Sequence, residues 1–325
     1  MLNVLLFSAL CLSWGSTWVA IKIGVERMPP LFYAGTRFMV AGVLIFVLAW
    51  IIDGRDSLKI KKGDGASLVW LSALVISICF SLIFWGEKYV SASLTAILVQ
   101  GMIPIFLPWF SVLLLKEKIS TAGLLSIAIG IAGLVIVFLP SVRASLSTDD
   151  ADGAGLLALY GLIAVVVGTL SYCYGSVKIK PILSRHSAIA ISGWQNFIGG
   201  ALTLAFSFAF EVDFDEVMPL LAGASSQVLY AWAWLVIVGS LLGFVLYVVL
   251  LKSWGATKLS PYAFVTPIVA IVIEYLLHGE LIRLFEAVGM VVLFVAVYLA
   301  LRNPEIKRPR WRISRTRTPR RGKRP

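Results

Sequence analysis

Three ionisable side chains that interrupt long apolar stretches are the first candidates for chemistry: Lys22, Arg37 and Glu274. A charge inside a lipid-spanning helix is costly unless it meets water or a partner, so each is a functional candidate by default. Glu274 predicts proton coupling, because a carboxylate in such surroundings can exchange a proton. Alternatively, Glu274 lies one turn from His278 and reaches interfacial water. Either cation could pair with Glu26 or Glu274, bind an anionic substrate group, or extend its stem to the interface.

Aromatic and polar side chains form a second group of candidates. Trp14, Trp18 and Lys22 recur at every fourth residue and therefore share one face of a helix. Such rings could enclose an apolar or cationic metabolite in a pocket with few polar anchors. The alternative interpretation is core packing and interfacial belts, which Trp and Tyr also form. The remaining candidates for the same cavity are Gln100, Tyr172, Tyr174, Tyr247, Tyr262 and Thr266.

Two prolines lie in the middle of apolar stretches. Pro104 and Pro267 each remove a helical hydrogen bond and crowd the preceding turn, which kinks or weakens a helix. Gln100 lies one turn before Pro104 and shares its face, just as Tyr262 and Thr266 share a face in the second stretch. We predict that the two prolines are hinges around a central site. The alternative is that they only pack, since membrane helices tolerate proline.

The side chains that bind metals or nucleotides are too few or too scattered. Two histidines, His186 and His278, cannot form a multi-histidine metal site, and the three cysteines lack paired ligand spacing. The sequence has no glycine-rich phosphate loop with its lysine. We therefore expect no metal, no cofactor, no catalytic residue and no direct use of ATP. The acidic cluster of Asp213, Asp215 and Glu216 is expected to be a solvated loop.

The elements that must position these residues are membrane-spanning helices. The chain has 325 residues, of which 59% are hydrophobic and only 14% charged, and its mean hydropathy is +0.93. Soluble domains average about 25% charged and about 45–50% apolar residues, and an excess of this size cannot be buried in one core. The same figures exclude the collagen-like, disordered and disulfide-scaffold classes. The chain is predicted to be an all-α polytopic membrane protein.

Ten apolar segments are each long enough to cross a bilayer, which takes about 20 residues. Most lysines and arginines outside these segments lie in the loops on the N-terminal side of the membrane and in the C-terminal tail. The positive-inside rule therefore predicts that both termini are cytoplasmic. The expected transmembrane helices are residues 2–24, 31–52, 66–86, 91–115, 120–140, 154–178, 187–210, 230–251, 256–278 and 284–301.

The two halves of the sequence match weakly but in register. Pro104 precedes Glu117 by 13 residues. Pro267 precedes Glu280 by the same spacing, and the two pairs match at an offset of 163. Five helices per half is an odd number, so the second copy must run upside down relative to the first. Inverted repeats are typical of secondary transporters, with the substrate site at the repeat interface. The predicted division is a first repeat at 1–140, an external linker at 141–153, a second repeat at 154–301 and a tail at 302–325.

Several short motifs occur in a characteristic order. They are Ser13-Trp14-Gly15-Ser16-Thr17-Trp18, then Pro29-Pro30 followed by Arg37, then Ser91-Ala92-Ser93-Leu94 with Pro104 and Lys116-Glu117, and finally Ala256-Thr257 with Pro267 and Gly279-Glu280. The set resembles the EamA-type proteins of the drug/metabolite transporter superfamily over residues 3–301. The resemblance implies a ten-helix exporter of small metabolites, often amino acids, with its cavity between helices 1, 3, 4, 6, 8 and 9. Because Arg37 matches a family motif, the resemblance favours a structural ion pair or outer gate there over a substrate ligand. Glu274 departs from the family pattern.

The C-terminal segment 302–325 is strongly basic. It is rich in Lys, Arg and Pro and has hardly any aliphatic side chains, so it cannot bury enough apolar surface to fold. We predict a disordered cytoplasmic tail that is attracted to anionic lipid. Nucleic-acid binding is not expected, because Trp311 is the tail's only aromatic residue.

Together these observations predict a secondary transporter of the plasma (inner) membrane. It would export small organic metabolites by alternating access, with amino acids the leading class. Coupling to protons, facilitated exchange and import remain open. One alternative is a carrier of phosphorylated or nucleotide-linked sugars, which would need more cations than Arg37, Lys22 and Lys258 provide. Another is a membrane-embedded lipid-modifying enzyme, which would need clustered acids or histidines at a membrane face.

Overall fold

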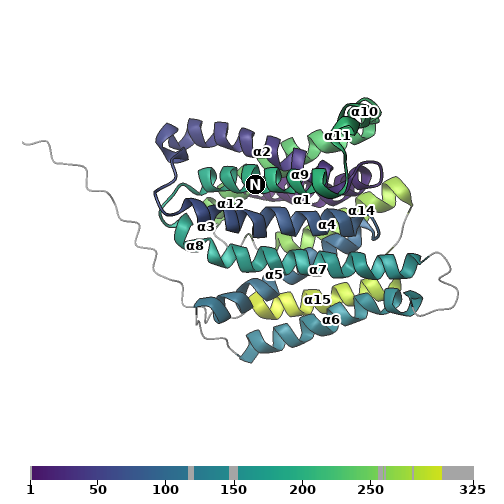
Figure 1. The fold of residues 1–325 in the computed structure, drawn as a ribbon. Coiled ribbons are helices and arrows are strands. Elements are labelled where there is room, and N and C mark those ends of the chain that lie inside the picture. Colours follow the sequence, from purple (N-terminus) through teal and green to yellow (C-terminus); the bar gives the residue numbers. More distant parts are fainter. Residues whose placement is uncertain are drawn as a thin grey trace, which may run out of the picture.

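The structure, a computed structural model, describes residues 2–115, 121–145, 153–254, 259, 261–279 and 282–301. Within these residues the chain forms helices and turns and no strand (Figure 1), which confirms the all-α prediction. Some predictions lie outside the described residues: those on the charged residues 116–118, on Lys258 and Glu280, on the acidic part of the 141–153 linker, and on the 302–325 tail.

The helices follow one another with short connections. The first half contains α1 (Leu2–Val25), α2 (Pro30–Asp53), the short 3-10 helix η1 (Arg55–Leu58), α3 (Gly65–Ser72), η2 (Ala73–Ile78), α4 (Cys79–Glu87), α5 (Ala92–Leu115) and α6 (Thr121–Ser145). The second half contains α7 (Ala154–Lys178), α8 (Lys180–Leu183), α9 (Ala188–Phe210), η3 (Phe214–Glu216), α10 (Val217–Ala222), α11 (Ser226–Trp234), η4 (Leu235–Leu242), α12 (Gly243–Trp254), α14 (Tyr262–His278) and α15 (Leu284–Leu301).

The ten predicted segments all coincide with helices, but the helices do not amount to ten simple spans. In the described part of the chain, seven helices are long and apolar enough to cross a membrane. An eighth span would be α9 together with η3 and α10, which bend away from it by 105°. The apolar helices α14 and α15 are shorter. The polytopic class is therefore confirmed, whereas the number of ten spans is not.

The helices lie side by side along one direction, so the bundle has two ends (Figure 1). We call the end with the α1–α2 turn at 26–29 and the α4–α5 turn at 88–91 the Lys22 end. The opposite end carries the α2–α3 connection at 54–64 and the α8–α9 turn at 184–187, and we call it the Asp64 end.

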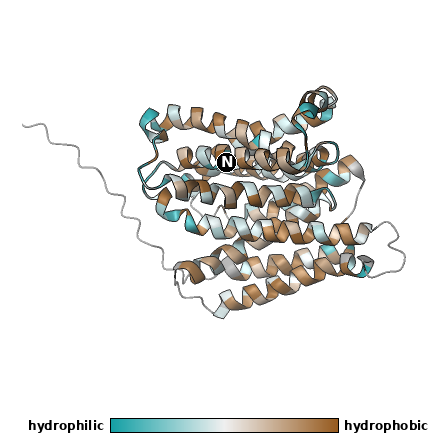
Figure 2. Ribbon diagram, in the orientation of Figure 1, coloured by the Kyte–Doolittle hydropathy of each residue, from teal (hydrophilic) through white to brown (hydrophobic). Residues whose placement is uncertain are grey.

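The outer surface of the bundle is apolar. Leu5, Ile51 and Val135 are each more than 60% exposed. Hydrophobic colours run along the helices in Figure 2, and hydrophilic ones gather near their ends. Soluble proteins rarely expose apolar surface so widely. The surface is therefore suited to lipid, and the chain is an integral membrane protein.

Glycines let helices from the two halves approach closely. A Cβ on Gly42 of α2 would lie 2.5 Å from the backbone nitrogen of Phe197 in α9. A Cβ on Gly200 of α9 would lie 2.5 Å from the backbone nitrogen of Met39 in α2. Small residues allow this kind of approach between membrane helices. The two contacts are reciprocal, so each half presents a similar surface to the other.

The third predicted helix of each half contains a π-helical stretch, η2 in one and η4 in the other. The offset of 163 found in the sequence maps η2 onto η4. The Ser13 hydroxyl of α1 donates to the carbonyl of Val238 in η4 at 2.7 Å. The Ser171 hydroxyl of α7 donates to the carbonyl of Leu74 in η2 at 2.8 Å. The first helix of each half thus binds the π-helical stretch of the other half, as expected for two related repeats.

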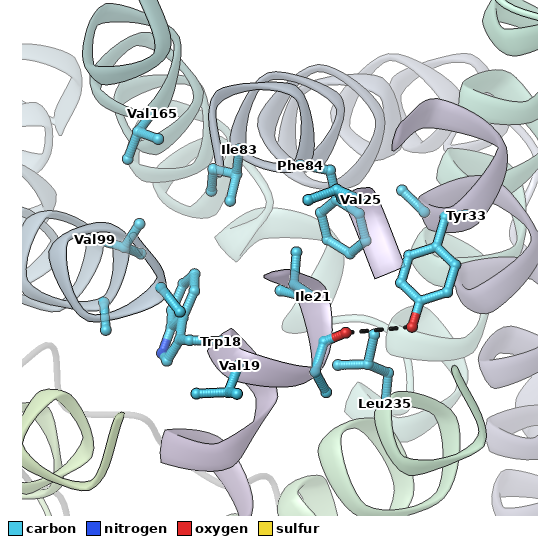
Figure 3. Packing of buried hydrophobic residues seen from close by; sticks show 14 of the residues in the cluster. Trp18, Val19, Ile21, Val25, Tyr33, Ile83, Phe84, Val99, Val165 and Leu235 are labelled. Atoms are coloured by element: carbon cyan, nitrogen blue, oxygen red, sulfur yellow. Dashed lines mark hydrogen bonds between the residues drawn. The ribbon is translucent and has the colours of Figure 1, made fainter. Parts of the chain in front are cut away.

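The largest cluster of buried apolar side chains lies toward the Lys22 end. In Figure 3, Ile21 of α1 lies close to Phe84 of α4, with Tyr33 of α2 beside them. The Tyr33 hydroxyl donates to the carbonyl of Ala20 at 3.3 Å. A Cβ on Gly24 would lie 2.1 Å from Cε1 of Tyr33, so glycine is required for α1 and α2 to meet here. This cluster closes the bundle between α1, α2 and α4.

Candidate functional site

A cavity of about 280 Å³ lies between the two halves. It reaches from Ile21 and Ile83, which belong to the cluster of Figure 3, to Ser192 and Tyr262, near the starts of α9 and α14. It therefore extends toward the Asp64 end and stops short of the Lys22 end. Helices α2 and α9 line it in addition to the helices that the family resemblance implies. Its polar and aromatic lining includes Trp14, Thr17, Trp18, Arg37, Phe38, Phe80, Gln100, Thr169, Tyr172, Ser192, Asn196, Ser240, Phe244 and Tyr262.

Arg37 supplies the charge in this lining. The residue is only 7% exposed. One terminal nitrogen lies 3.4 Å from the Ser240 hydroxyl, and the guanidinium lies 4.2 Å from the centre of the Phe38 ring. Its Nε has no hydrogen-bond partner among the described residues. Because a guanidinium has five N–H donors, Arg37 retains donors for a ligand.

Lys22 lies outside the cavity, at the Lys22 end. Its Nζ donates to the carbonyls of Glu87 and Val90 at 3.0 Å each, and to that of Lys88 at 3.3 Å. It also lies 3.6 Å from Glu26, so one of the predicted ion pairs is present. A cation at the end of α4 matches the negative end of the helix dipole. Lys22 therefore stabilises the turn between α4 and α5.

Glu274 also lies outside the cavity, on the other side of that turn. Its two carboxylate oxygens accept hydrogen bonds from the backbone nitrogens of Ala92 and Ser93, both at 2.8 Å, at the start of α5. Glu274 is therefore a cap of α5, supplied by α14. No carboxylate of the described residues lies within ion-pairing distance of Arg37, so the ion pair predicted for Arg37 with Glu26 or Glu274 is absent there. Proton coupling at Glu274 remains a prediction.

Trp14 belongs to an aromatic cluster in the cavity wall. Its indole nitrogen donates to the carbonyl of Gly239 at 3.2 Å. Its ring stacks on Tyr247 and meets Tyr262 edge-on, with ring centres 5.4 and 5.1 Å apart. Trp14 and Tyr262 line the cavity, whereas Tyr247, which was also predicted to line it, packs against both rings and is not among the described lining residues. Trp18 also lines the cavity, and its buried indole nitrogen has no partner among the described residues.

The two tyrosines predicted on α7 face different ways. Tyr172 lines the cavity, whereas Tyr174 is not among its described lining residues. Tyr174 packs edge-on against Phe110 of α5, with ring centres 5.7 Å apart, and lies beside Lys178. Consecutive residues of an α-helix are rotated by about 100°, so positions two apart cannot share a face. Tyr174 thus lies on another face of α7 than Tyr172, and its role in the cavity remains a prediction.

The predicted hinge regions lie beside the cavity. Gln100 of α5 lines it, one turn before Pro104. Thr266 of α14 is wholly buried outside the lining, and its hydroxyl has no partner among the described residues. Both α5 and α14 continue as single helices through Pro104 and Pro267. The hinge role of these prolines therefore remains a prediction.

Glu87 is a residue that sequence reasoning missed. It is the last residue of α4 and is fully buried, and neither carboxylate oxygen accepts a hydrogen bond from a described residue. In the sequence it follows the predicted segment 66–86 and precedes Lys88, a position typical of interfacial residues. Helical spacing could have identified Glu87, because it lies one turn after Ile83 on the same face of the helix.

Polar residues of the second half complete the lining and were also missed. Ser192 and Asn196 lie one turn apart on α9, and Ser240 lies in η4. Their occurrence within apolar segments, at helical spacing for the first two, was the signal that could have found them. Together with Gln100 they provide donors and acceptors on several sides of the cavity.

A second pocket, of about 290 Å³, lies at the Lys22 end and is largely polar. Lys22, Glu26, Ser91 and Arg283 are among its lining residues. The central cavity ends at Ile21, which is the residue before Lys22. Phe84 and Glu87 follow the cavity-lining Ile83 along α4 toward the Lys22 end, and Tyr33 packs against Phe84; we call these three side chains the closed layer.

The apolar exterior, the helical bundle and a ligand-sized cavity between two related halves define an integral membrane transporter. The chain belongs to the EamA-like transporter family, whose model matches residues 1–139 and 159–302. The resemblance predicted from the sequence motifs is therefore confirmed.

Several relatives match over nearly the whole chain. The uncharacterized transporter YoaV of Bacillus subtilis is 27% identical over 89% of this chain and 92% of its own length. Protein PagO of Salmonella typhimurium is 26% identical, with 91% and 92% covered. The uncharacterized inner membrane transporter YedA of Escherichia coli is 27% identical, with 90% and 88% covered. A solved crystal structure, 16% identical, shares the fold with a TM-score of 0.60 over 92% of this chain and 96% of the other.

Proposed function

We propose that the protein exports small organic metabolites by alternating access, with amino acids and related carboxylic acids as its leading substrates. The observation that carries this proposal is Arg37, a buried guanidinium at the central cavity without a carboxylate of the described chain beside it. A guanidinium binds a carboxylate through two parallel hydrogen bonds. A substrate carboxylate would therefore be the counter-ion of Arg37.

The rest of the lining suits the remainder of an amino acid. Gln100, Asn196 and Ser240 offer hydrogen-bond donors and acceptors. The rings of Trp18 and Tyr172 present faces that attract an ammonium group. The cavity volume of about 280 Å³ lies at the small end of ligand pockets, which favours a small metabolite.

The two alternatives are less well supported. A phosphorylated or nucleotide-linked sugar calls for several cations, and Arg37 is the one charged group among the described lining residues. A lipid-modifying enzyme calls for grouped acids or histidines, and the described ranges hold no group of three His, Cys, Asp or Glu side chains placed for a metal.

We further propose that the protein lies in the inner membrane with both termini in the cytoplasm. The distribution of Lys and Arg and the name of the relative YedA support this placement. In this orientation the central cavity extends toward the cytoplasm, and the cluster of Figure 3 closes the outer side. Flexing of α5 at Pro104 and of α14 at Pro267 would contribute to the state in which the cavity opens to the outer side of the membrane. The basic tail would contact anionic lipid.

Exchange of labelled amino acids across proteoliposome membranes tests the proposal. The wild-type protein should show saturable exchange of at least one class of amino acid. Arg37→Met should lower that exchange about 10- to 100-fold, because hydrogen bonds between charged groups contribute about 1.5–3 kcal/mol. Arg55→Met, at an exposed position in η1, is the matched control and should exchange like wild type. Equal exchange in Arg37→Met would remove Arg37 from substrate binding, and a lack of saturable flux would contradict the substrate class.

A further inference from the structure

Glu87 belongs to the closed layer, on the Lys22 side of the central cavity. On α4, Ile83 lines the central cavity, and Glu87 lies one turn further on the same face. On α1, Ile21 lines the central cavity, and the adjacent Lys22 lines the polar pocket. Glu87 therefore lies one helical turn from a residue of the central cavity, and its backbone carbonyl binds Lys22, a residue of the polar pocket.

The charged and titratable groups around Glu87 come from three helices. Lys22 of α1 and Glu274 of α14 act on its carboxyl, and Tyr33 of α2 is close enough to interact with both Glu87 and Arg37. The elements η2 and α5, which also pack near α4, contain no charged residue, and α7 carries its lysine at the Asp64 end. Lys88, the next residue in the chain, lies over the ring of Tyr89, so among the described residues Lys22 is the cation and Glu274 the anion that act on the Glu87 carboxyl.

The groups that could have stabilised an ionised Glu87 are otherwise engaged. The Lys22 ammonium donates to three backbone carbonyls, one of them that of Glu87 itself, and it lies beside Glu26. The backbone nitrogens at the start of α5 are taken by Glu274. An ionised carboxylate that is fully buried and receives no hydrogen bond is very costly, so the neutral acid is the form compatible with this packing.

We propose that Glu87 is a proton-binding site that couples transport to a proton gradient. The proposal rests on the transport function proposed above and adds its driving force. In the closed layer described here Glu87 carries its proton. When the layer opens and water reaches the carboxyl, the O–H bond breaks, the proton passes to water, and the electron pair stays on the carboxylate. The adjacent Lys22 ammonium then provides the counter-charge. Closing the layer again requires a proton from the side that is open.

Glu274, predicted from the sequence as the coupling acid, fits this role less well. Both of its oxygens already accept hydrogen bonds from the N-terminus of α5, where a negative charge is favoured. Both Glu274 oxygens are thus engaged with α5, whereas neither Glu87 oxygen accepts a hydrogen bond from a described residue. The proposal therefore gives the two acids different roles. Glu274 caps α5 at the turn between α4 and α5, and Glu87 binds and releases the proton.

Uptake of labelled amino acids into proteoliposomes, with and without a pH gradient, tests the coupling. In the wild type the gradient should accelerate uptake, and a pH-sensitive dye should report proton movement in step with it. Glu87→Gln should lose this acceleration, whereas Glu274→Gln and the surface control Asp56→Asn should keep it. A wild type that transports but ignores the gradient overturns the coupling and leaves the transport function standing. Loss of acceleration in Glu274→Gln, with Glu87→Gln unaffected, assigns the proton to Glu274 instead.

An infrared measurement tests whether the Glu87 carboxyl is protonated, and it needs no substrate. A protonated carboxyl has a C=O stretching band that an ionised carboxylate lacks, and the purified wild type at neutral pH should show it. The band should disappear in Glu87→Gln and persist in Glu274→Gln and Asp56→Asn. A band that persists in Glu87→Gln overturns the proposal. Because this readout needs no flux, it still tests Glu87 if no amino acid is transported and the proposed function fails.

Discussion

At the Lys22 end of the bundle charged side chains bind backbone groups, whereas at the Asp64 end charged side chains pair with one another. At the first end, Lys22 binds the carbonyls of Glu87 and Val90 at and after the end of α4, Glu274 caps α5, and Glu211 accepts from the backbone nitrogens of Leu31 and Phe32 at the start of α2. At these three helix ends, the backbone groups are therefore hydrogen-bonded by a side chain from another helix or from the turn next to that helix.

At the Asp64 end the contacts are of another kind. Asp64 binds Arg185 at 2.7 Å and His186 at 2.8 Å, and the Arg185 side chain is 50% exposed. Ser187 donates to Asp53 nearby. The half-exposed Arg185 can exchange its partner for water at little cost, whereas Asp64 is only 7% exposed and lies against the buried His186 side chain. Helix ends away from water need a partner inside the protein. These caps, which other parts of the chain supply to helix ends, lie at the Lys22 end, and the central cavity extends toward the opposite end.

The largest effect is expected from Glu274→Ala. Removing the carboxylate leaves two buried N–H groups of α5 without acceptors, which should cost about 2–5 kcal/mol. The midpoint of thermal unfolding in detergent should fall markedly. Glu274→Gln should fall less, because its amide oxygen can still accept one of the two hydrogen bonds. An unchanged midpoint in Glu274→Ala would mean that this cap contributes nothing to closing the Lys22 end.

Lys22→Met comes next. It removes the donor to three carbonyls at the end of α4 while keeping the length of the side chain, at an expected cost of about 1.5–3 kcal/mol. The same thermal midpoint measures the loss. Lys22→Arg keeps the cation and should recover most of it. If Met and Arg behave alike, the charge of Lys22 is irrelevant to the stability of this end.

Gly24→Ala tests the packing of the closed layer independently of charge. The new methyl group would collide with the ring of Tyr33, and overpacking of this kind costs about 1–3 kcal/mol. Gly65→Ala is the matched control, because a Cβ there meets no atom within 4 Å. Equal thermal midpoints for the two variants would show that α1 and α2 can separate here without penalty.

Asp64→Asn should have the smallest effect. Asp64 is itself buried, but the amide of the variant can still bond to His186, and the pair with the half-exposed Arg185 is worth about 0–1 kcal/mol. The change in thermal midpoint should be slight and should shrink further at high salt, which screens the pair with Arg185. A loss as large as that of Glu274→Ala would contradict the difference between the two ends.

Helices and faces were predictable from the sequence, because they depend on residues close together in the chain. Hydropathy located the apolar segments, and four-residue spacing placed Trp14 and Trp18 on one face. The same rule, applied to Tyr172 and Tyr174, would have separated them, since residues two apart diverge around a helix.

The roles of the buried charges were not predictable in this way. Glu274 caps α5 because folding brings α14 beside Ala92 and Ser93, which precede Glu274 by 182 and 181 residues in the chain. The Glu87 carboxylate has no hydrogen-bond partner among the described residues because its neighbours are engaged elsewhere. Both facts depend on which helix ends meet in the folded protein, and this information is not contained in the spacing of nearby residues. The internal repeat was a partial exception to this limit on sequence prediction. Matching motifs far apart in the chain indicated that the two halves are related in structure.

The π-helical stretches η2 and η4 have a consequence for insertions and deletions. Removing one residue from an ordinary α-helix rotates everything after it by about 100° and turns a lipid-facing side chain inward. A π-helical turn already holds one residue more than an α-helical turn, so a deletion there converts it to α-helix and leaves both flanks facing as before. A deletion scan through 65–87 and 226–254 should therefore find two islands of tolerance, one in each repeat, at 73–78 and 235–242.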